Sequence, residues 1–322
     1  MGYWVRRLLY SIPLIIGMLF VSFVLMRLAP GDPSNMFLDP RMNASDLLQI
    51  RKNLALDQPI PVQFLAWSKR AICGDLGFST STGQPVIQAI SDRLPATLLL
   101  SLTSLVMTLV ITFLLGIISA AKATKWPDML ITFITFLGMS IPTFWIGLML
   151  ILIFSVTLNW LPASGFYDPT LDSSEKIAII GSTIQHLILP VIACTIGSIA
   201  GLTRYYRFGM INILQQPYIL AARARGISPW RILSRHAFKN AALPIITLLG
   251  MELPGLVSGA YIVEYIFAWP GLGQLGINAA FSRDYPVLMG TLFMSSVLIL
   301  IGNFLADVMY SWADPRINRN AS

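Results

Sequence analysis

Long apolar runs dominate the pattern of hydrophobic and polar positions along this chain. Six of them fit membrane-spanning helices, for which about 20 apolar residues are needed. They cover residues 8–26, 94–121, 129–158, 187–202 with a continuation toward Arg204 and Arg207, 241–263 and 287–309. No small-residue cleavage site separates the first run from Pro30, so we interpret it as an uncleaved span and not as a signal peptide. The pattern predicts an all-α polytopic membrane protein with six transmembrane helices.

Prolines fall inside predicted spans, and two connections between spans are long. Pro142 and Pro254 can be accommodated because neighbouring helices satisfy the backbone groups that a proline frees. A connection as long as segment 30–93, with its helix-like stretch at 45–56, usually has a function or a fold of its own. We therefore divide the chain into a tail and first span (1–29), a long external segment (30–93), a five-helix core (94–310) that includes a cytoplasmic stretch (204–240), and a tail (311–322).

The composition agrees with a membrane protein. Of the 322 residues 55% are hydrophobic and 11% are charged, whereas soluble domains carry roughly 25% charged residues. This composition excludes a disordered chain, a collagen and a secreted disulfide scaffold, and it leaves too little charge to coat a water-soluble enzyme. The two cysteines, Cys73 and Cys194, are expected to stay unpaired, and two thiols alone cannot form a zinc site.

The charges are distributed unevenly between the two sides of the predicted spans. Thirteen of the 22 Lys and Arg residues fall on the side of the N-terminus, while 11 of the 15 Asp and Glu residues, Glu264 among them, fall on the opposite side. Because basic residues accumulate in cytoplasmic loops, both termini are expected in the cytoplasm of a bacterial-type cell, with the spans in its inner membrane. The net charge of +7 is explained by this topology, so nucleic-acid binding is not required.

The cytoplasmic stretch has the pattern of two short helices joined by a turn. Residues 218–225 favour a helix, and Gly226 stands where a helix end needs a left-handed residue. Ser228 and Pro229 suit the first positions of a second helix. That helix has a basic face and a more apolar one, formed respectively by Arg231, Arg235 and Lys239 and by Trp230, Leu233 and Ala237. Such a hairpin fits either a surface lying on anionic lipid headgroups or a docking element for a cytoplasmic protein.

The same stretch resembles the cytoplasmic signature of ABC-importer permeases, often written EAA-x3-G with a downstream I-x-L-P. Here Ala221 and Ala222 are followed after three residues by Gly226, and Pro244 lies downstream. Leu220 replaces the Glu, and the gap to Pro244 is longer than in the general pattern. Both departures are similar to the peptide and nickel branch of the family, in which A-R-A-x-G (here 222–226) and R-H-A-x-x-N-A (here 235–241) are usual.

Further motifs extend the resemblance over nearly the whole chain. They are R-L-A-P-G-D-P at 27–33, L-D-Q-P at 56–59, G-D-L-G at 74–77, R-L-P-A-T at 93–97, S-I-P-T-F-W at 140–145, W-L-P at 160–162, W-P-G-L-G at 269–273, R-D-Y-P at 283–286 and D-P-R at 314–316. Each is weak alone, but together and in this order they are specific. The chain is identified by resemblance as the first of two permeases in a dipeptide, oligopeptide or nickel type importer.

The resemblance implies a type I ABC importer permease fold and a division of labour between subunits. A second homologous permease would complete the membrane path, two cytoplasmic ATPases would use ATP and Mg²⁺, and an extracytoplasmic binding protein would deliver the substrate. This chain would bind no cofactor or metal itself and would be no enzyme. The implied ATPase-coupling residues are Ala221, Ala222, Arg223, Arg225 and Gly226.

Other functions remain open on the residues alone. The chain has no G-x4-G-K-[ST] loop to cradle phosphates, so its energy must come from a partner or from an ion gradient, as in a secondary transporter. Catalytic motifs of intramembrane enzymes are absent from the sequence. The substrate is also open, because permeases for peptides, glutathione, nickel and metallophores look alike at this level.

Glu252 is the one carboxylate predicted in the middle of a span. Intramembrane carboxylates are candidates for functional sites. Glu252 could line the translocation path, form a hydrogen bond between helices or at a permease–permease interface, or carry protons in a gradient-driven carrier. The two histidines, His186 and His236, fall on opposite sides of the membrane and cannot share a metal.

Overall fold

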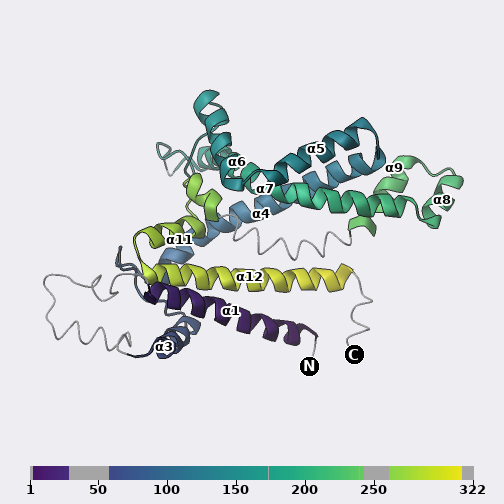
Figure 1. The fold of residues 1–322 in the computed structure, drawn as a ribbon. Coiled ribbons are helices and arrows are strands. Elements are labelled where there is room, and N and C mark those ends of the chain that lie inside the picture. The colour runs from purple at the N-terminus through teal and green to yellow at the C-terminus, as the bar shows by residue number, and fades with distance from the viewer. Residues whose placement is uncertain (1–2, 29–57, 173, 239, 243–260, 314–322) are drawn as a thin grey trace, which may run out of the picture. The chain divides into compact units, whose positions relative to one another are not determined.

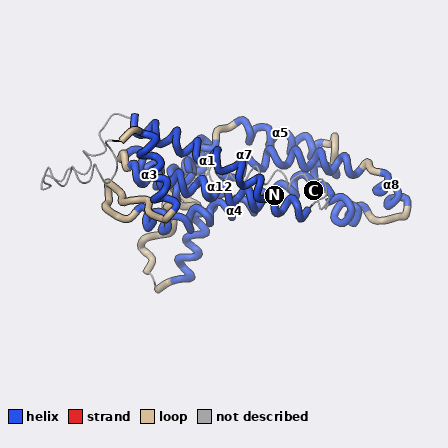
Figure 2. The backbone as a smooth tube through the Cα atoms, turned by 90° about the horizontal axis from the view of Figure 1, so that it is seen from below, coloured by secondary structure: helices blue, strands red, loops and turns tan. Residues whose placement is uncertain are grey.

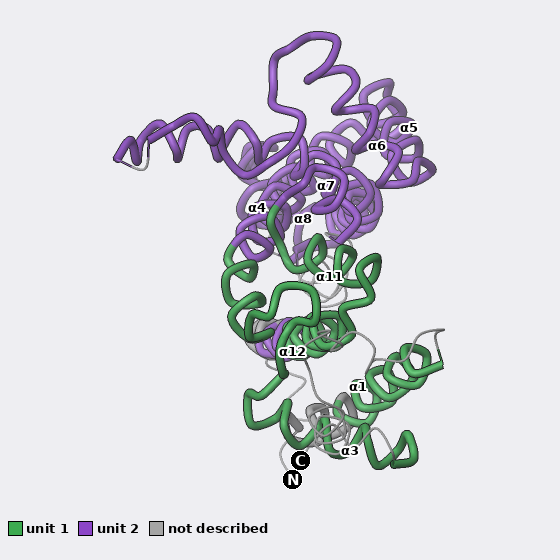
Figure 3. The backbone as a smooth tube through the Cα atoms, turned by 90° about the vertical axis from the view of Figure 1, so that its left-hand side faces the viewer, with its two compact units in different colours: residues 1–95, 270–300 green, residues 96–269, 301–322 purple. Residues whose placement is uncertain are grey.

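The structure is a computed structural model that describes residues 3–28, 58–172, 174–238, 240–242 and 261–313. These residues are mostly helical (Figure 2). Outside the helices, an isolated antiparallel bridge joins Phe78 and Pro85. The chain divides into two compact units (Figure 3). Unit 1 comprises residues 1–95 and 270–300, and unit 2 comprises residues 96–269 and 301–322.

Unit 1 is built from helices that come from both ends of the chain. They are α1 (Tyr3–Leu28), α3 (Ile60–Ile72), the start of α4 (Val86–Ala121), α11 (Leu272–Phe281) and most of α12 (Tyr285–Ala313) (Figure 1). Phe64 of α3 packs edge-on against Phe20 and Phe23 of α1, and Met289 of α12 joins the same buried cluster. Residues 58–93 of the predicted external segment thus contain a helix and a turn that pack within unit 1.

Asp284 joins the start of α12 to the turn before α4. It is 1% exposed, and its carboxylate accepts hydrogen bonds from the hydroxyls of Ser79 (2.5 Å) and Ser81 (2.7 Å). It also caps α12 by accepting from the N–H of Val287 at 3.3 Å. Burial raises the pKa of Asp284, but these hydroxyls and neighbouring backbone N–H groups outweigh burial and hold the pKa below its usual range.

Unit 2 contains the remainder of α4 and the helices between α4 and α11. They are α5 (Trp126–Ser140), α6 (Thr143–Leu150), the π-helical segment η2 (Ile151–Thr157), α7 (Lys176–Leu214), α8 (Pro217–Ala224), α9 (Pro229–Arg231) and the π-helical segment η3 (Ile232–Ala237). α5 and α7 lie side by side (Figure 1). One core of unit 2 centres on Trp269 and Phe267, and a second on Tyr206 and Met210.

Among the described residues, three helices are long and apolar enough to cross a membrane. They cover Val86–Ala121, Lys176–Leu214 and Tyr285–Leu305. The first begins eight residues before the predicted run at 94, and the second extends the run at 187–202 in both directions. The apolar part of α1, Ile12–Leu28, is shorter than these. Most of the predicted fifth span, at 241–263, lies outside the described residues.

The predicted third span is not one continuous helix, which corrects the interpretation of residues 129–158. α5 ends at Ser140, and the helix that continues through α6 and η2 is bent from it by 103°. Pro142 explains the break, because a proline disfavours helical backbone in the residue before it. Ile141 is accordingly extended, with φ −97° and ψ 128°.

Candidate functional site

The turn after α8 has the backbone geometry that the sequence predicted. Gly226 adopts a left-handed conformation with φ +75°. Its N–H donates to the carbonyl of Arg223 at 2.9 Å, and the N–H of Ile227 donates to the carbonyl of Ala222 at 3.2 Å. These two bonds form a Schellman motif, which ends a helix by satisfying its last carbonyls. The chain is thereby reversed toward α9.

α8 buries one face and exposes the other. Ile219 and Ala222 are 0% and 2% exposed and pack against Ile232 of η3. Ile227 and the end of α7 cover the same small core. The predicted coupling residues therefore divide into two groups: Ala222 is buried, and Ala221, Arg223, Arg225 and Gly226 are exposed. The exposed group forms a surface with small side chains and two positive charges.

Gly226 is required by its backbone conformation and not by crowding within the chain. A side-chain carbon built on it would meet no atom of the described residues within 4 Å. A left-handed φ disfavours residues with a side chain, most strongly the β-branched ones. The space beside Gly226 is open on the exposed side of the hairpin, where a partner could approach the backbone closely.

The second half of the hairpin differs in part from the predicted helix. A single turn, α9, passes into the π-helical segment η3, and Ser228 forms no side-chain cap. Trp230 is 71% exposed, so it does not share a buried apolar face with Ala237, which is 0% exposed. Arg231 and Arg235 are exposed, as the basic face required, and Lys239 lies outside the described residues.

Two kinds of contact attach the hairpin to its surroundings. The side-chain amide of Asn240 donates to the hydroxyl of Tyr218 on α8 at 3.1 Å. Ala237 and Ala241 are buried in the core around Tyr206 of α7. The second family-like pattern, at 235–241, is therefore joined to α7 and, through Tyr218, to the start of α8.

A buried ion pair near this end of α7 was not singled out by the sequence reasoning. Arg207 donates to both carboxylate oxygens of Asp128 at 2.6 Å, from Nε and Nη2. The Ser119 hydroxyl and the N–H of Thr124 (2.8 Å) donate to the same carboxylate, which is 3% exposed. The pair joins α5, the end of α4 and α7. The sequence offered one weak signal of this pair. Asp128 lies in the first turn of α5, where a negative charge interacts favourably with the helix dipole.

The structure describes one of the two carboxylates at or near the predicted fifth span. Glu252 lies outside the described residues. Glu264, which the charge count placed on the outer side, is fully buried in unit 2 and accepts a hydrogen bond from the Thr97 hydroxyl at 2.7 Å. The indole of Trp269 donates to the Ala96 carbonyl at 2.9 Å beside it. Counting charges along the sequence could not reveal this burial, because α4 lies far away in the sequence.

Among the described residues, no group of three or more His, Cys, Asp or Glu side chains lies close enough together to hold a metal ion. His186 instead hydrogen-bonds the Ser182 carbonyl of its own helix at 2.8 Å.

Comparison with known proteins identifies the family. Residues 112–319 match the model of the binding-protein-dependent transport system inner membrane component, and residues 1–103 match the model of the N-terminal part of such membrane components. The chain belongs to this family. The resemblance that the hairpin and the dispersed motifs predicted is thereby confirmed, and this inner membrane component is a transport subunit.

Similar proteins extend over the full length of this permease. It is 43% identical to the oligopeptide transport system permease protein AppB of Bacillus subtilis, over 98% of this chain and 99% of that one. It is 37% identical to a putative peptide permease protein of Brucella ovis, over 98% of each, and 35% identical to the dipeptide transport system permease protein DppB of Alkalihalophilus pseudofirmus, over 98% and 99%.

A solved structure shows the same fold. The inward-facing MetNI methionine ABC transporter matches with a TM-score of 0.56 and 17% identity, over 73% of this chain and 97% of the matched chain. The permease therefore has the helical fold of an ABC importer permease.

Proposed function

We propose that this permease forms half of the membrane path of an ATP-driven, binding-protein-dependent importer of di- or oligopeptides. The observation that carries this proposal is full-length similarity, at 35–43% identity, to proteins named as oligopeptide and dipeptide permeases. A second homologous permease would form the other half. Two ATPases would hydrolyse ATP with Mg²⁺, and an extracytoplasmic binding protein would deliver the peptide.

The exposed face of α8 and the turn after it form the proposed ATPase contact. Ala221 and Gly226 allow a partner to approach the backbone closely, while Arg223 and Arg225 supply charge, and Ala222 holds the helix onto η3. We expect Arg223→Glu with Arg225→Glu to impair assembly or coupling, because a positive surface becomes negative. The measurement is substrate-stimulated ATP hydrolysis by the purified complex, compared with Lys176→Glu, a charge change far from α8. Normal assembly and coupling would leave the lipid-headgroup alternative.

Six spans complete the proposed topology. They are α1, α4, the bent pair of α5 with α6 and η2, α7, a fifth at 241–263, and α12. Both termini and segment 204–240 would be cytoplasmic. Segment 30–93 would be external and would connect the tail and first span (1–29) to the core (94–310). Residues 311–322 would form a cytoplasmic tail. The strong excess of basic residues on the N-terminal side supports this orientation. Glu252 is proposed to line the path.

The proposal is tested by extracting the chain gently from its native membrane and identifying what copurifies. Recovery of a second permease and Walker-motif ATPases, together with ATP-dependent peptide uptake after reconstitution, is the expected result. Recovery of the chain alone, with uptake driven by an ion gradient without ATP, would instead establish a secondary transporter. Screening the binding protein with nickel, metallophores and glutathione tests the substrate alternatives.

A further inference from the structure

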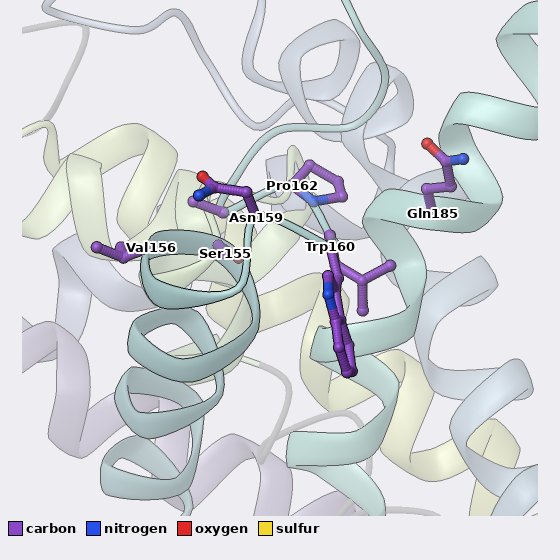
Figure 4. Close-up of a pocket in the computed structure, with 8 residues that line it drawn as sticks. Ser155, Val156, Asn159, Trp160, Pro162 and Gln185 are labelled. Carbon is purple, nitrogen blue, oxygen red and sulfur yellow. The ribbon is translucent and has the colours of Figure 1, made fainter.

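A hollow of about 420 Å³ lies in unit 2 where η2 ends and the chain turns toward α7 (Figure 4). This volume falls in the range of sites for small molecules. Ser155, Asn159, Trp160, Pro162 and Gln185 are among the lining residues, and none of the lining residues carries a charge. Figure 4 shows Trp160 between Asn159, two residues after the end of η2, and Gln185, on α7.

The hollow lies at the end of unit 2 opposite the hairpin. Gln185 is in the third turn of α7, whereas Leu214 ends the same helix next to α8. At 1.5 Å per residue, these two positions are about 40 Å apart, which exceeds the thickness of the bilayer core. In the proposed orientation the hollow therefore opens near the external face, where a delivered substrate would enter.

The backbone around the hollow is held in place. Asn159 takes a left-handed φ of +53°, and the next two N–H groups, of Trp160 and Leu161, both donate to the Phe154 carbonyl at 2.9 and 3.3 Å. The Trp160 and Phe154 rings lie 6.0 Å apart. Further along, the N–H of Gly165 donates to the Phe267 carbonyl at 2.9 Å. These contacts preorganise the lining, which lowers the entropy cost of binding.

The lining chemistry matches the main chain of a peptide. Asn159 and Gln185 are exposed, and each side-chain amide offers donors and an acceptor, as a peptide group does. The hydroxyl oxygen of Ser155 is buried and has no hydrogen-bond partner among the described residues. Trp160, 69% exposed, offers a flat apolar surface with one N–H. A neutral lining of this kind can bind the main-chain N–H and C=O groups that all peptides share, and it does not select for side-chain charge.

We propose that this hollow is a contact site for the main chain of the transported peptide, with Asn159 and Gln185 pairing with its peptide groups. The proposal rests on the proposed function. It assigns substrate contact to the connection between η2 and α7, whereas the proposed ATPase contact is at the other end of α7.

The test uses the complete importer, reconstituted with its ATPases and binding protein, and the tripeptides Ala-Lys-Ala and Ala-Glu-Ala as probes. Gln185→Glu adds a negative charge to the hollow with almost no change of shape. Gln88→Glu is the matched control, because Gln88 is exposed at the start of α4 and does not line the hollow. We expect Gln185→Glu to raise the ratio of kcat/KM for the lysine peptide over the glutamate peptide by about fivefold or more, the effect of close charges in water. Gln88→Glu should leave the ratio unchanged.

Asn159→Asp provides a second variant that should shift the ratio in the same direction. The backbone should keep its left-handed conformation there, because Asp tolerates it about as well as Asn. If both variants keep the wild-type ratio while transport continues, the hollow does not contact the peptide. An equal loss for both peptides, with weaker stimulation of ATP hydrolysis by the binding protein, would make it a docking surface and overturn the proposal. A wild-type importer that carries neither peptide would overturn the proposed function itself.

Discussion

Gly226 and Ala222 lie four residues apart in the hairpin, but each is small for a different reason. Ala222 is 2% exposed and packs against Ile232, so a longer side chain there would push α8 away from η3. Gly226 has open space where a side chain would begin, and only its φ of +75° favours glycine. Substitution at Gly226 can therefore separate the backbone requirement from contact with a partner.

Gly226→Val is expected to impair coupling more than membrane insertion. A β-branched residue in the left-handed region costs about 1–2 kcal/mol, which distorts the turn that positions α8. The measurement is substrate-stimulated ATP hydrolysis of the assembled complex, alongside the amount of permease inserted in the membrane.

Gly226→Asn is the matched control, because asparagine tolerates positive φ. Near-normal coupling in Gly226→Asn together with impaired coupling in Gly226→Val would locate the requirement in the backbone. Equal impairment in both would indicate that a partner needs the open space. Normal coupling in Gly226→Val would count against the docking role.

Asp284 should make the stability of unit 1 depend on pH in the acidic range. Its pKa is lowered in the folded protein, so the stability that it contributes is complete above its unfolded pKa, about 3.9, and is lost as the pH falls through the folded value. Asp284→Asn removes the charge but keeps a capping side chain. We expect the difference in thermal unfolding between wild type and Asp284→Asn, measured in detergent, to be largest near pH 7 and to shrink toward pH 3. A difference independent of pH would contradict this assignment.

At the scale of elements, α7 receives contacts from the hairpin and from α5 over a short distance. Ile213 and Leu214 at its end pack against the core of α8, and Arg207, about two turns earlier, pairs with Asp128 of α5. A displacement of α8 would therefore be transmitted to α7 and, through the ion pair, to α5. This arrangement gives the buried pair a role in holding these helices together.

Breaking this pair is expected to destabilise the permease. Asp128→Asn should cost about 2 kcal/mol, less than the 3–5 kcal/mol typical of a fully buried pair, because Arg207 retains 28% exposure. Arg207→Gln combined with Asp128→Asn should recover part of the loss, since no unpaired charge then remains. Thermal unfolding of the two single variants and the double variant measures the coupling between them. Strictly additive losses would show that the residues do not act as a pair.

Features whose causes lie within a few neighbouring residues could be predicted from the sequence, and features that depend on distant residues could not. The turn at Gly226 could be predicted, because helix propensity, a glycine and the next helix start all lie within a few residues. The Asp128–Arg207 pair joins residues 79 positions apart, and Glu264 meets Thr97 across 167 positions. Such contacts depend on how helices pack, which no local pattern encodes. The break at Pro142 was missed because an apolar run indicates the length of a span and does not reveal a change of direction within it.

At the scale of the whole molecule, function would depend on α7 as a continuous connection within unit 2. This helix runs for 39 residues from the hollow around Trp160 to the hairpin. In the proposed importer, one end would contact the peptide and the other the ATPase. α7 continues through Pro190 without a break and so connects the two ends, whereas the pair of α5 with α6 and η2 is bent at Ile141 and Pro142.

The bend of 103° also makes the path of this pair through the membrane testable. If α5 with α6 and η2 crosses once, Thr124 and Ser164 lie on opposite sides of the membrane; a re-entrant pair would place them on the same side. Single cysteines at these positions can be labelled with an impermeant maleimide after Cys73→Ser and Cys194→Ala remove the native thiols. We expect Ser164→Cys to react from outside and Thr124→Cys only after the membrane is opened. The exposed native Cys73, kept alone, should react from outside as the control for segment 30–93. Labelling of both introduced cysteines from one side would reduce the span count and reverse the order of sides for every helix after α5.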